Sequence, residues 1–219
     1  MAISVDEIIS SKGYIGWLKS DASPKTRDWW LQIKDGVVIL NPEMIATSLE
    51  QMKALVDQHI WEWKKILVIY EKSLLREELE QIASKKWIYY LNYKVPGGIL
   101  TNFDTILKRV KSMNELRQFV ESPEFALLTK KEQLTKKRSL AKLEMVYKWI
   151  KDLDSKPDLV ILLDGMYKPS LLDEVRKSGI PYLVVSSPTL NRNLEDDRVV
   201  ITNTHSYKAL LMVLNYLFS

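Results

Sequence analysis

The sequence predicts an α/β fold: a three-layer sandwich with a mainly parallel sheet, Rossmann-like or flavodoxin-like, that carries an inserted helical hairpin. Four short segments are almost wholly apolar, at residues 66–70, 159–163, 182–185 and 199–201. Apolar runs without alternation are typical of strands buried on both faces of a parallel sheet. Segments with helical spacing alternate with these runs, which is the order of a sheet covered by helices on both faces.

The remaining elements of the body follow from the same patterns. Two further apolar runs, at residues 37–40 and 87–91, are expected to be a fifth and a sixth strand. Helices are expected at residues 42–59, 73–84, 170–178 and 204–217. Ser4 with Glu7, and Ser170 with Asp173, have the spacing of a capping box, in which side-chain oxygens satisfy free amides of the first helical turn.

Residues 101–153 interrupt this alternation, because they contain no strand pattern. One helix is expected from Phe103, opened by a capping box at Thr101 and Asp104. Pro123 ends it, since proline cannot continue a helix interior. A second helix is expected to start at a capping box formed by Thr129 and Glu132. The interpretation is a coiled-coil hairpin at residues 104–151, inserted into a sandwich domain made of residues 1–103 and 152–219.

The positive charge is concentrated in the hairpin. The whole chain has a net charge of +4, but residues 104–151 hold twelve Lys or Arg against six Asp or Glu. A basic element on a near-neutral body favours a polyanionic partner, although a solvated helix face would have the same composition. The strongest cluster is at residues 130–138, where five basic residues stand against one acid.

Several function classes are not supported by the composition. The chain has no cysteine and two histidines, His59 and His205, so thiolate chemistry is excluded and a metal centre is not expected. Neither a glycine-rich nucleotide loop nor a nucleophile elbow is present. We therefore expect no enzymatic activity and no cofactor. No apolar segment is long enough to span a membrane, and the acidic N-terminal stretch argues against a targeting peptide.

One alternative reading concerns Asp164, which directly follows the apolar run at residues 159–163. The carboxyl ends of parallel strands are where α/β ligand sites form. This position resembles the phospho-acceptor of receiver domains, so a receiver-like signalling domain is the alternative function. Receivers also carry an acidic pair after their first strand, which this sequence lacks, and a structural Asp164 that caps a turn is the simpler interpretation.

Motifs along most of the chain resemble the bacterial and organellar family of the second small-subunit ribosomal protein. The segment VPGGILTNFDTI at residues 95–106 matches the family's hairpin opening. LTKKE at residues 128–132 and KLE at residues 142–144 match its second hairpin helix. The Pro-Asp and Gly-Ile-Pro segments of the family correspond to Pro157 with Asp158 and to residues 179–181. Each motif is short, but their order and spacing together are specific.

The sequence also departs from the family pattern. Trp17 replaces a histidine, Lys94 to Pro96 replace Arg-Trp-Leu, residues 186–188 replace Asp-Thr-Asn, and residues 202–205 replace Pro-Gly-Asn-Asp. The missing arginine puts one RNA contact in doubt. The divergence and the excess of lysine over arginine favour a mitochondrial form, with plastid and bacterial forms as alternatives.

The resemblance implies a structural constituent of the small ribosomal subunit that binds ribosomal RNA and neighbouring ribosomal proteins. No membrane insertion and no homo-oligomer are expected. The residues expected to contact RNA lie at the base and in the second helix of the hairpin: Lys94, Gly97, Gly98, Thr101, Asn102, Lys130, Lys131, Lys136, Lys137 and Arg138. Of the basic residues in the helix, Lys130, Lys137 and Arg138 are expected to share one face, with Lys131 and Lys136 beside it.

The seven tryptophans allow two readings. Trp61, Trp63 and Trp149 are expected to pack in the core or at an interface rather than to stack on bases. Trp29 and Trp30 are expected to be exposed and to contact RNA or a partner protein, together with Lys25 and Arg27.

Overall fold

The computed structural model describes residues 3–86, 88–193 and 196–219. Within these residues the main sheet has five parallel strands: β4 (Ile66–Ile69), β5 (Tyr89–Leu91), β6 (Leu159–Leu163), β7 (Tyr182–Ser186) and β8 (Val199–Ile201), in the spatial order β5-β4-β6-β7-β8. Every residue of β4, β6, β7 and β8 is buried. Burial on both faces explains the continuous apolar runs, and the predicted α/β class with a parallel sheet is confirmed.

The strand at residues 37–40 lies in a different sheet from the one expected. β3 (Val37–Leu40) pairs in antiparallel fashion with β1 (Ile15–Leu18) and β2 (Trp30–Lys34), in the order β1-β3-β2. Its burial alternates, with Val38 and Leu40 buried and their neighbours partly exposed, because only one face of this sheet is covered. The run at residues 37–40 is thus a strand, as expected, but it does not join the main sheet, which has five strands within the described residues. The first residue of the strand predicted at residues 87–91 lies outside the described residues.

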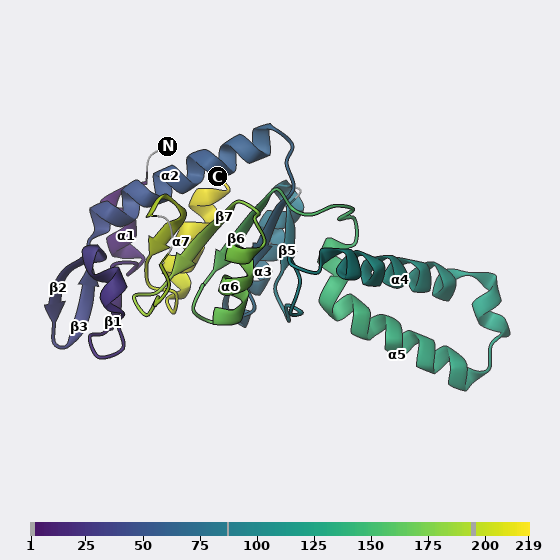
Figure 1. Cartoon of the computed structure of the whole chain (residues 1–219). Helices are drawn as coiled ribbons and strands as arrows, with labels where there is room; N and C mark the ends of the chain where they lie inside the picture. The colour runs from purple at the N-terminus through teal and green to yellow at the C-terminus, as the bar shows by residue number, and fades with distance from the viewer. Residues whose placement is uncertain (1–2, 87, 194–195) are drawn as a thin grey trace.

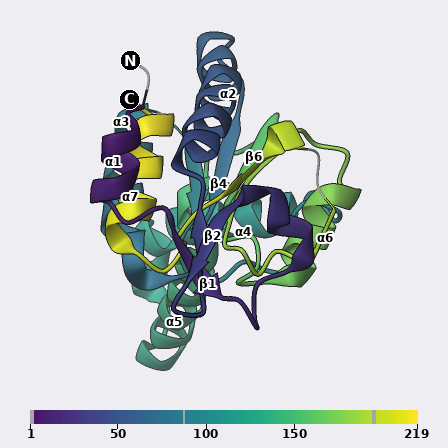
Figure 2. The ribbon, with the colours of Figure 1, turned by 90° about the vertical axis from the view of Figure 1, so that its left-hand side faces the viewer.

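Helices cover both faces of the main sheet, as expected. α1 (Val5–Ser10), α3 (Arg76–Lys86) and α7 (Tyr207–Leu217) lie on one side, and α6 (Pro169–Lys177) lies on the other (Figure 2). The longest body helix, α2 (Pro42–Trp61), runs along the molecule and contacts α1 and α7 (Figure 1). Short 3-10 turns η1 (Pro24–Trp29), η2 (Ser73–Leu75) and η5 (Asp196–Arg198) connect these elements.

Two of the four predicted capping boxes form. Ser4 caps α1 with Glu7, and Thr129 caps the second hairpin helix with Glu132. The box expected at Ser170 and Asp173 does not form, because the chain enters α6 at Lys168 and Asp173 pairs with Arg192 instead. The box expected at Thr101 and Asp104 also fails, since α4 starts from Asn102 without a side-chain cap.

The inserted segment projects from the β5 edge of the sheet as two adjacent helices (Figure 1). α4 (Phe103–Glu121) and α5 (Lys130–Tyr147) are joined by the 3-10 turn η3 (Pro123–Leu127), and η4 (Lys148–Ile150) leads back to the body. Arg117 on α4 donates a 2.7 Å hydrogen bond to Glu144 on α5, and Phe119 packs edge-on against Phe125 at 5.9 Å. The coiled-coil geometry and the division into domains at residues 104 and 151 stay predictions.

Candidate nucleic-acid interface

The base of the hairpin is held to the body by one carboxylate, that of Glu174 on α6. Its oxygens accept hydrogen bonds from the backbone N–H groups of Gly98 (3.0 Å), Leu100 (2.7 Å) and Thr101 (3.2 Å). The left-handed φ of +79° at Gly98 turns these amides towards one point, and glycine adopts that conformation without strain. Converging backbone amides form a concave site for an anion, and here the chain supplies the anion itself.

A second acidic residue fixes the segment just before this turn. Glu71, which follows β4, accepts hydrogen bonds from the amide of Val95 and from Lys168 Nζ, the latter at 3.0 Å. Lys168 also donates to the carbonyl of Val95 at 2.6 Å. The strand end at β4, the start of α6 and the hairpin base are thus joined by a closed set of polar contacts.

These contacts give several of the predicted RNA-binding residues a role within the chain. The amides of Gly98 and Thr101 are occupied by Glu174, and the Asn102 side chain accepts a hydrogen bond from Thr105 at 2.7 Å. Lys94 and Gly97 are exposed, and the Lys94 ammonium group makes no ion pair within the described residues. The glycine pair was noticed in the sequence, but Glu174 was not, because it lies more than seventy residues further along the chain.

The hairpin tip has the opposite character. Lys130, Lys131, Lys137 and Arg138 are all exposed, and none of them makes an ion pair within the described residues. Each lies three or four residues from Leu134, so the four cations surround this side chain on one helix face. Leu134 is 49% exposed. We call these four residues the tip quartet.

Lys136 lies outside the quartet. It is two residues from Leu134, which places it on another side of α5, and its ammonium group lies 5.9 Å from the ring centre of Phe119 on α4. Lys137 lies at a similar distance, 5.6 Å, from Phe125 in the turn. The sequence predicted that Lys131 and Lys136 both lie beside the basic face of α5. In the structure Lys131 lies on that face, whereas Lys136 lies towards α4.

The predicted partner-contact segment is less exposed than expected. Trp29 is 8% exposed and belongs to the core, while Trp30 is partly buried and its indole N–H donates to Thr26. The expectation of an exposed tryptophan pair was wrong for Trp29, which is the last residue of η1 and is buried together with Thr26 of the same turn. Lys25 and Arg27 are exposed in η1, and their contact with a partner stays a prediction.

Asp164 lies at the carboxyl end of β6, next to the end of β4, where the chain order of the sheet reverses. It is buried, has a left-handed φ of +62°, and forms an ion pair with Lys72. Lys72 Nζ is 3.4 Å from Nε2 of His205, and burial together with Lys72 lowers the pKa of that histidine. Among the described residues no group of three or more acidic or histidine side chains could hold a metal ion.

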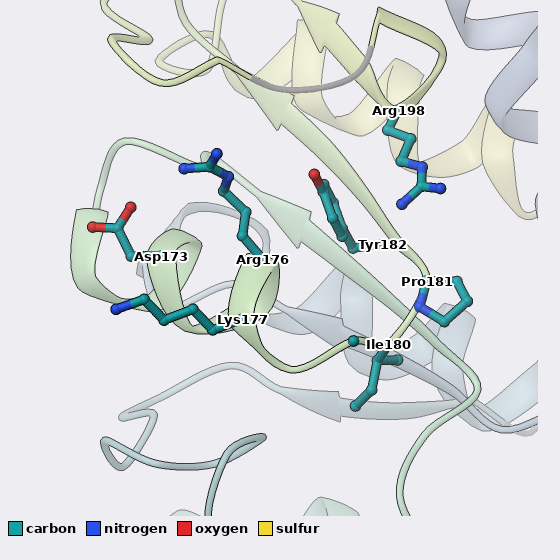
Figure 3. A pocket seen from close by; sticks show the side chains of 8 residues that line it. Asp173, Arg176, Lys177, Ile180, Pro181, Tyr182 and Arg198 are labelled. Carbon is teal, nitrogen blue, oxygen red and sulfur yellow. The ribbon is translucent and has the colours of Figure 1, made fainter.

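A hollow of about 520 Å³ lies where α6 ends and β7 begins (Figure 3). Arg176 and Lys177 come from the last turn of α6, and the guanidinium of Arg198 lies 5.3 Å from the Tyr182 ring centre. Asp173 on the same wall is held by Arg192 at 2.8 Å. Cations in the last helical turn complement the partial negative charge of the helix end, which accounts for Arg176 and Lys177 without a ligand.

Comparison with known proteins decides the family. The family model described as Ribosomal protein S2 matches residues 8–219, which is nearly the whole chain. The chain belongs to the ribosomal protein S2 family. Small ribosomal subunit protein uS2 of Petrotoga mobilis is 23% identical over 216 residues, which cover 97% of this chain and 74% of that protein. The resemblance to this family is thereby confirmed.

Membership of the ribosomal protein S2 family gives the chain a structural role in the small ribosomal subunit, as the motifs predicted. It argues against the receiver alternative, in which Asp164 would accept a phosphate, and the carboxylate is already paired with Lys72. Two departures from the family pattern lie against each other, because the rings of Trp17 and His205 are 4.2 Å apart. None of the helices formed by the described residues has the length and apolar character needed to cross a membrane.

Proposed function

We propose that this chain is a non-catalytic constituent of the small ribosomal subunit that binds ribosomal RNA through the tip quartet and neighbouring ribosomal proteins through its body. The observation that carries this proposal is the absence of any ion-pair partner for the quartet among the described residues. Unpaired cations on a projecting helix neutralise phosphates and release counterions on binding. Such contacts position a protein on RNA and do not read its sequence.

The base of the hairpin supports this function indirectly. The contacts of Glu174 and Glu71 fix the direction in which α4 leaves the body. A fixed hairpin loses less conformational freedom when its tip is ordered on RNA, so the rigid base favours binding. Lys94, Gly97 and Asn102 remain candidates for a second RNA contact at this base, which we place after the tip.

We propose a mitochondrial ribosome as the location. The support is the divergence from the bacterial relative, at 23% identity, and the lysine-rich composition of the basic residues. A plastid or a bacterial ribosome is the alternative. Fractionation of the source cells, followed by detection of the chain in small ribosomal subunits of the separated organelles, distinguishes these locations.

The test of the RNA contact is a salt series with small-subunit RNA fragments. Lys137→Ala combined with Arg138→Ala should flatten the slope of log affinity against log salt by about two units, one for each lost phosphate contact. Lys19→Ala combined with Lys34→Ala is the matched control, because both lysines are exposed near the three-stranded sheet at the far end of the molecule (Figure 1). Equal slopes for the hairpin variant and the control would refute the proposed contact.

A further inference from the structure

Two tryptophans at the end of α2 are almost fully exposed. Trp61 is 82% and Trp63 is 91% exposed, so neither packs in the core. The other part of the expectation, packing at an interface, stays a prediction. They lie at the right-hand end of α2 in Figure 1, where the chain turns down to β4. A single exposed apolar residue is ordinary, but two tryptophans this exposed within three residues of each other need a reason.

The backbone around Trp63 makes its exposure costly. α2 ends in a Schellman motif, in which the amide of Lys64 donates to the carbonyl of His59 at 2.9 Å and the amide of Trp63 donates to that of Ile60 at 3.1 Å. Trp63 occupies the left-handed position of this motif, with φ of +54°, where glycine is preferred. A bulky residue is strained there, and an exposed ring gives no packing energy in return.

The two rings border a hollow of about 480 Å³ whose lining combines apolar and basic residues. Ile60, Ile66 and Ile88 supply apolar surface, while Lys64, Lys85 and Lys86 supply positive charge. Lys85 and Lys86 belong to the last turn of α3. Lysines in a last turn are explained in part by the helix dipole, but that effect does not explain the tryptophans.

Of the three lysines that line the hollow, only Lys64 has an acidic partner among the described residues. None of the residues that line the hollow is acidic. Glu62, between the two tryptophans, is engaged by Lys64 and by Gln58 at 2.8 Å, and the hydrogen bond from Lys64 lowers its pKa. Lys85 and Lys86 are exposed and make no ion pair within the described residues.

We propose that Trp61, Trp63, Lys64, Lys85 and Lys86 form a binding surface for a single-stranded segment of RNA. Unpaired bases would stack on the indole rings while the unpaired Lys85 and Lys86 contact the phosphates, which is how sequence-tolerant single-strand binding works. Lys64 stays paired with Glu62 at the edge of the surface. A protein partner fits less well, because protein interfaces are enriched in tryptophan but depleted in lysine. The inference rests on the proposed function for its class of partner, and adds a contact on the body that differs from the hairpin tip.

The test compares variants of the full chain on a short oligouridylate and on an RNA duplex of equal length. Trp61→Ala combined with Trp63→Gly should weaken binding of the oligouridylate by roughly tenfold or more at every salt concentration, since each stacked base contributes substantially. The salt slope should not change. Lys85→Ala combined with Lys86→Ala should instead flatten the slope by roughly 1.4 units, because single strands release about 0.7 ions per contact.

Trp63→Gly alone separates a binding role from a folding role. Glycine relieves the strained φ, so this variant should unfold at a higher urea concentration than the wild type while binding the oligouridylate more weakly. Leu31→Ala is the control, because it removes another exposed apolar side chain at the far end of the molecule. Lower stability of Trp63→Gly with unchanged RNA affinity would show a folding role and overturn the proposal.

The same series keeps the two proposals distinguishable. The tryptophan variants should leave duplex binding unchanged, whereas the Lys137→Ala and Arg138→Ala double variant should weaken it. If the Lys137→Ala and Arg138→Ala double variant bound RNA as the wild type does, while the tryptophan variants still bound the oligouridylate more weakly, the proposed function would be contradicted and this inference would stand. Unchanged oligouridylate affinity in the Trp61 and Trp63 double variant would overturn the inference and assign the surface to a protein neighbour.

Discussion

The base and the tip of the hairpin differ in whether their charged groups have partners within the chain. At the base, three backbone amides converge on the carboxylate of Glu174, so an anion-binding site is filled from within the chain. At the tip, four cations surround Leu134 and find no acidic partner among the described residues. A polar group that is satisfied internally stabilises the fold, whereas one left unsatisfied on the surface is available to a partner.

This difference separates the effects expected from mutations in the two regions. Changes to the internal contacts of the base, at Glu174 and Gly98, should lower the free energy of unfolding and leave the salt dependence of RNA binding unaltered. Changes at the tip should do the reverse, since exposed charged residues without partners contribute little to stability.

The largest effect on stability is expected for Glu174→Ala. The variant leaves the amides of Gly98, Leu100 and Thr101 without their acceptor, and losing hydrogen bonds to a charged group should cost about 2–3 kcal/mol in the free energy of unfolding. Urea denaturation measures this. Glu174→Gln keeps one acceptor oxygen and should recover part of the loss. If both variants were as stable as the wild type, the base would not depend on this carboxylate.

Gly98→Ala should have the next largest effect. Its φ of +79° is unfavourable for alanine, so the free energy of unfolding should fall by about 1–2 kcal/mol. A methyl group there would lie 3.4 Å from the Asn102 side chain, which is tight but not a clash. Gly97→Ala is the matched control, because space around it is open, and it should change stability by less than about 0.5 kcal/mol. Equal losses in both variants would show that backbone conformation is not the cause.

The sequence predicted the strands that are buried on both faces and missed those that are partly exposed. β4, β6 and β7 are buried on both faces and were visible as apolar runs. β1 and β2 were missed because they are short and partly exposed, so few of their residues carry an apolar signal. β3 was recognised but assigned to the wrong sheet, since four apolar residues do not specify a pairing partner.

The candidate site was predictable only where it is local in sequence. The five basic residues at positions 130–138 were found from charge alone, whereas the separation of the tip quartet from Lys136 came from the structure. The partner of the glycine turn, Glu174, could not be found in this way, because tertiary packing brings α6 to the hairpin base. The exposure of Trp29 was predicted wrongly, and for Trp63 the sequence left the core and an interface open, since periodicity does not report exposure in short irregular segments.

Within the tip, Lys131→Ala and Lys136→Ala should differ although they remove the same charge from the same helix. Lys131 belongs to the quartet, so its loss should flatten the salt slope on RNA by about one unit. Lys136 lies over Phe119, and its loss should mainly cost the cation–π contact, about 0.5–1 kcal/mol of stability. Identical slopes for the two variants would show that the tip binds RNA through its overall charge and not through one face.

The smallest effect concerns pH at the start of α5. Hydrogen bonds from Thr129 hold the pKa of Glu132 below its ordinary range. A lowered pKa in the folded state means that the capping box is fully formed at pH values above the ordinary pKa and is lost as the pH falls through the lowered one. Amide chemical shifts of residues 130–132 should therefore change together in acid. Thr129→Ala is the control, because it removes the capping box. In this variant the amide chemical shifts of residues 130–132 should not change with pH in the same range.

The central claim is that the tip quartet binds ribosomal RNA through phosphate contacts. The most direct measurement is the slope of log affinity against log salt for small-subunit RNA fragments and a variant with Lys130, Lys131, Lys137 and Arg138 all changed to Gln. The account predicts a slope flatter by roughly three to four units than that of the wild type. The urea midpoint should fall only by the loss of the contact between Lys137 and Phe125. A slope equal to that of the wild type would contradict it.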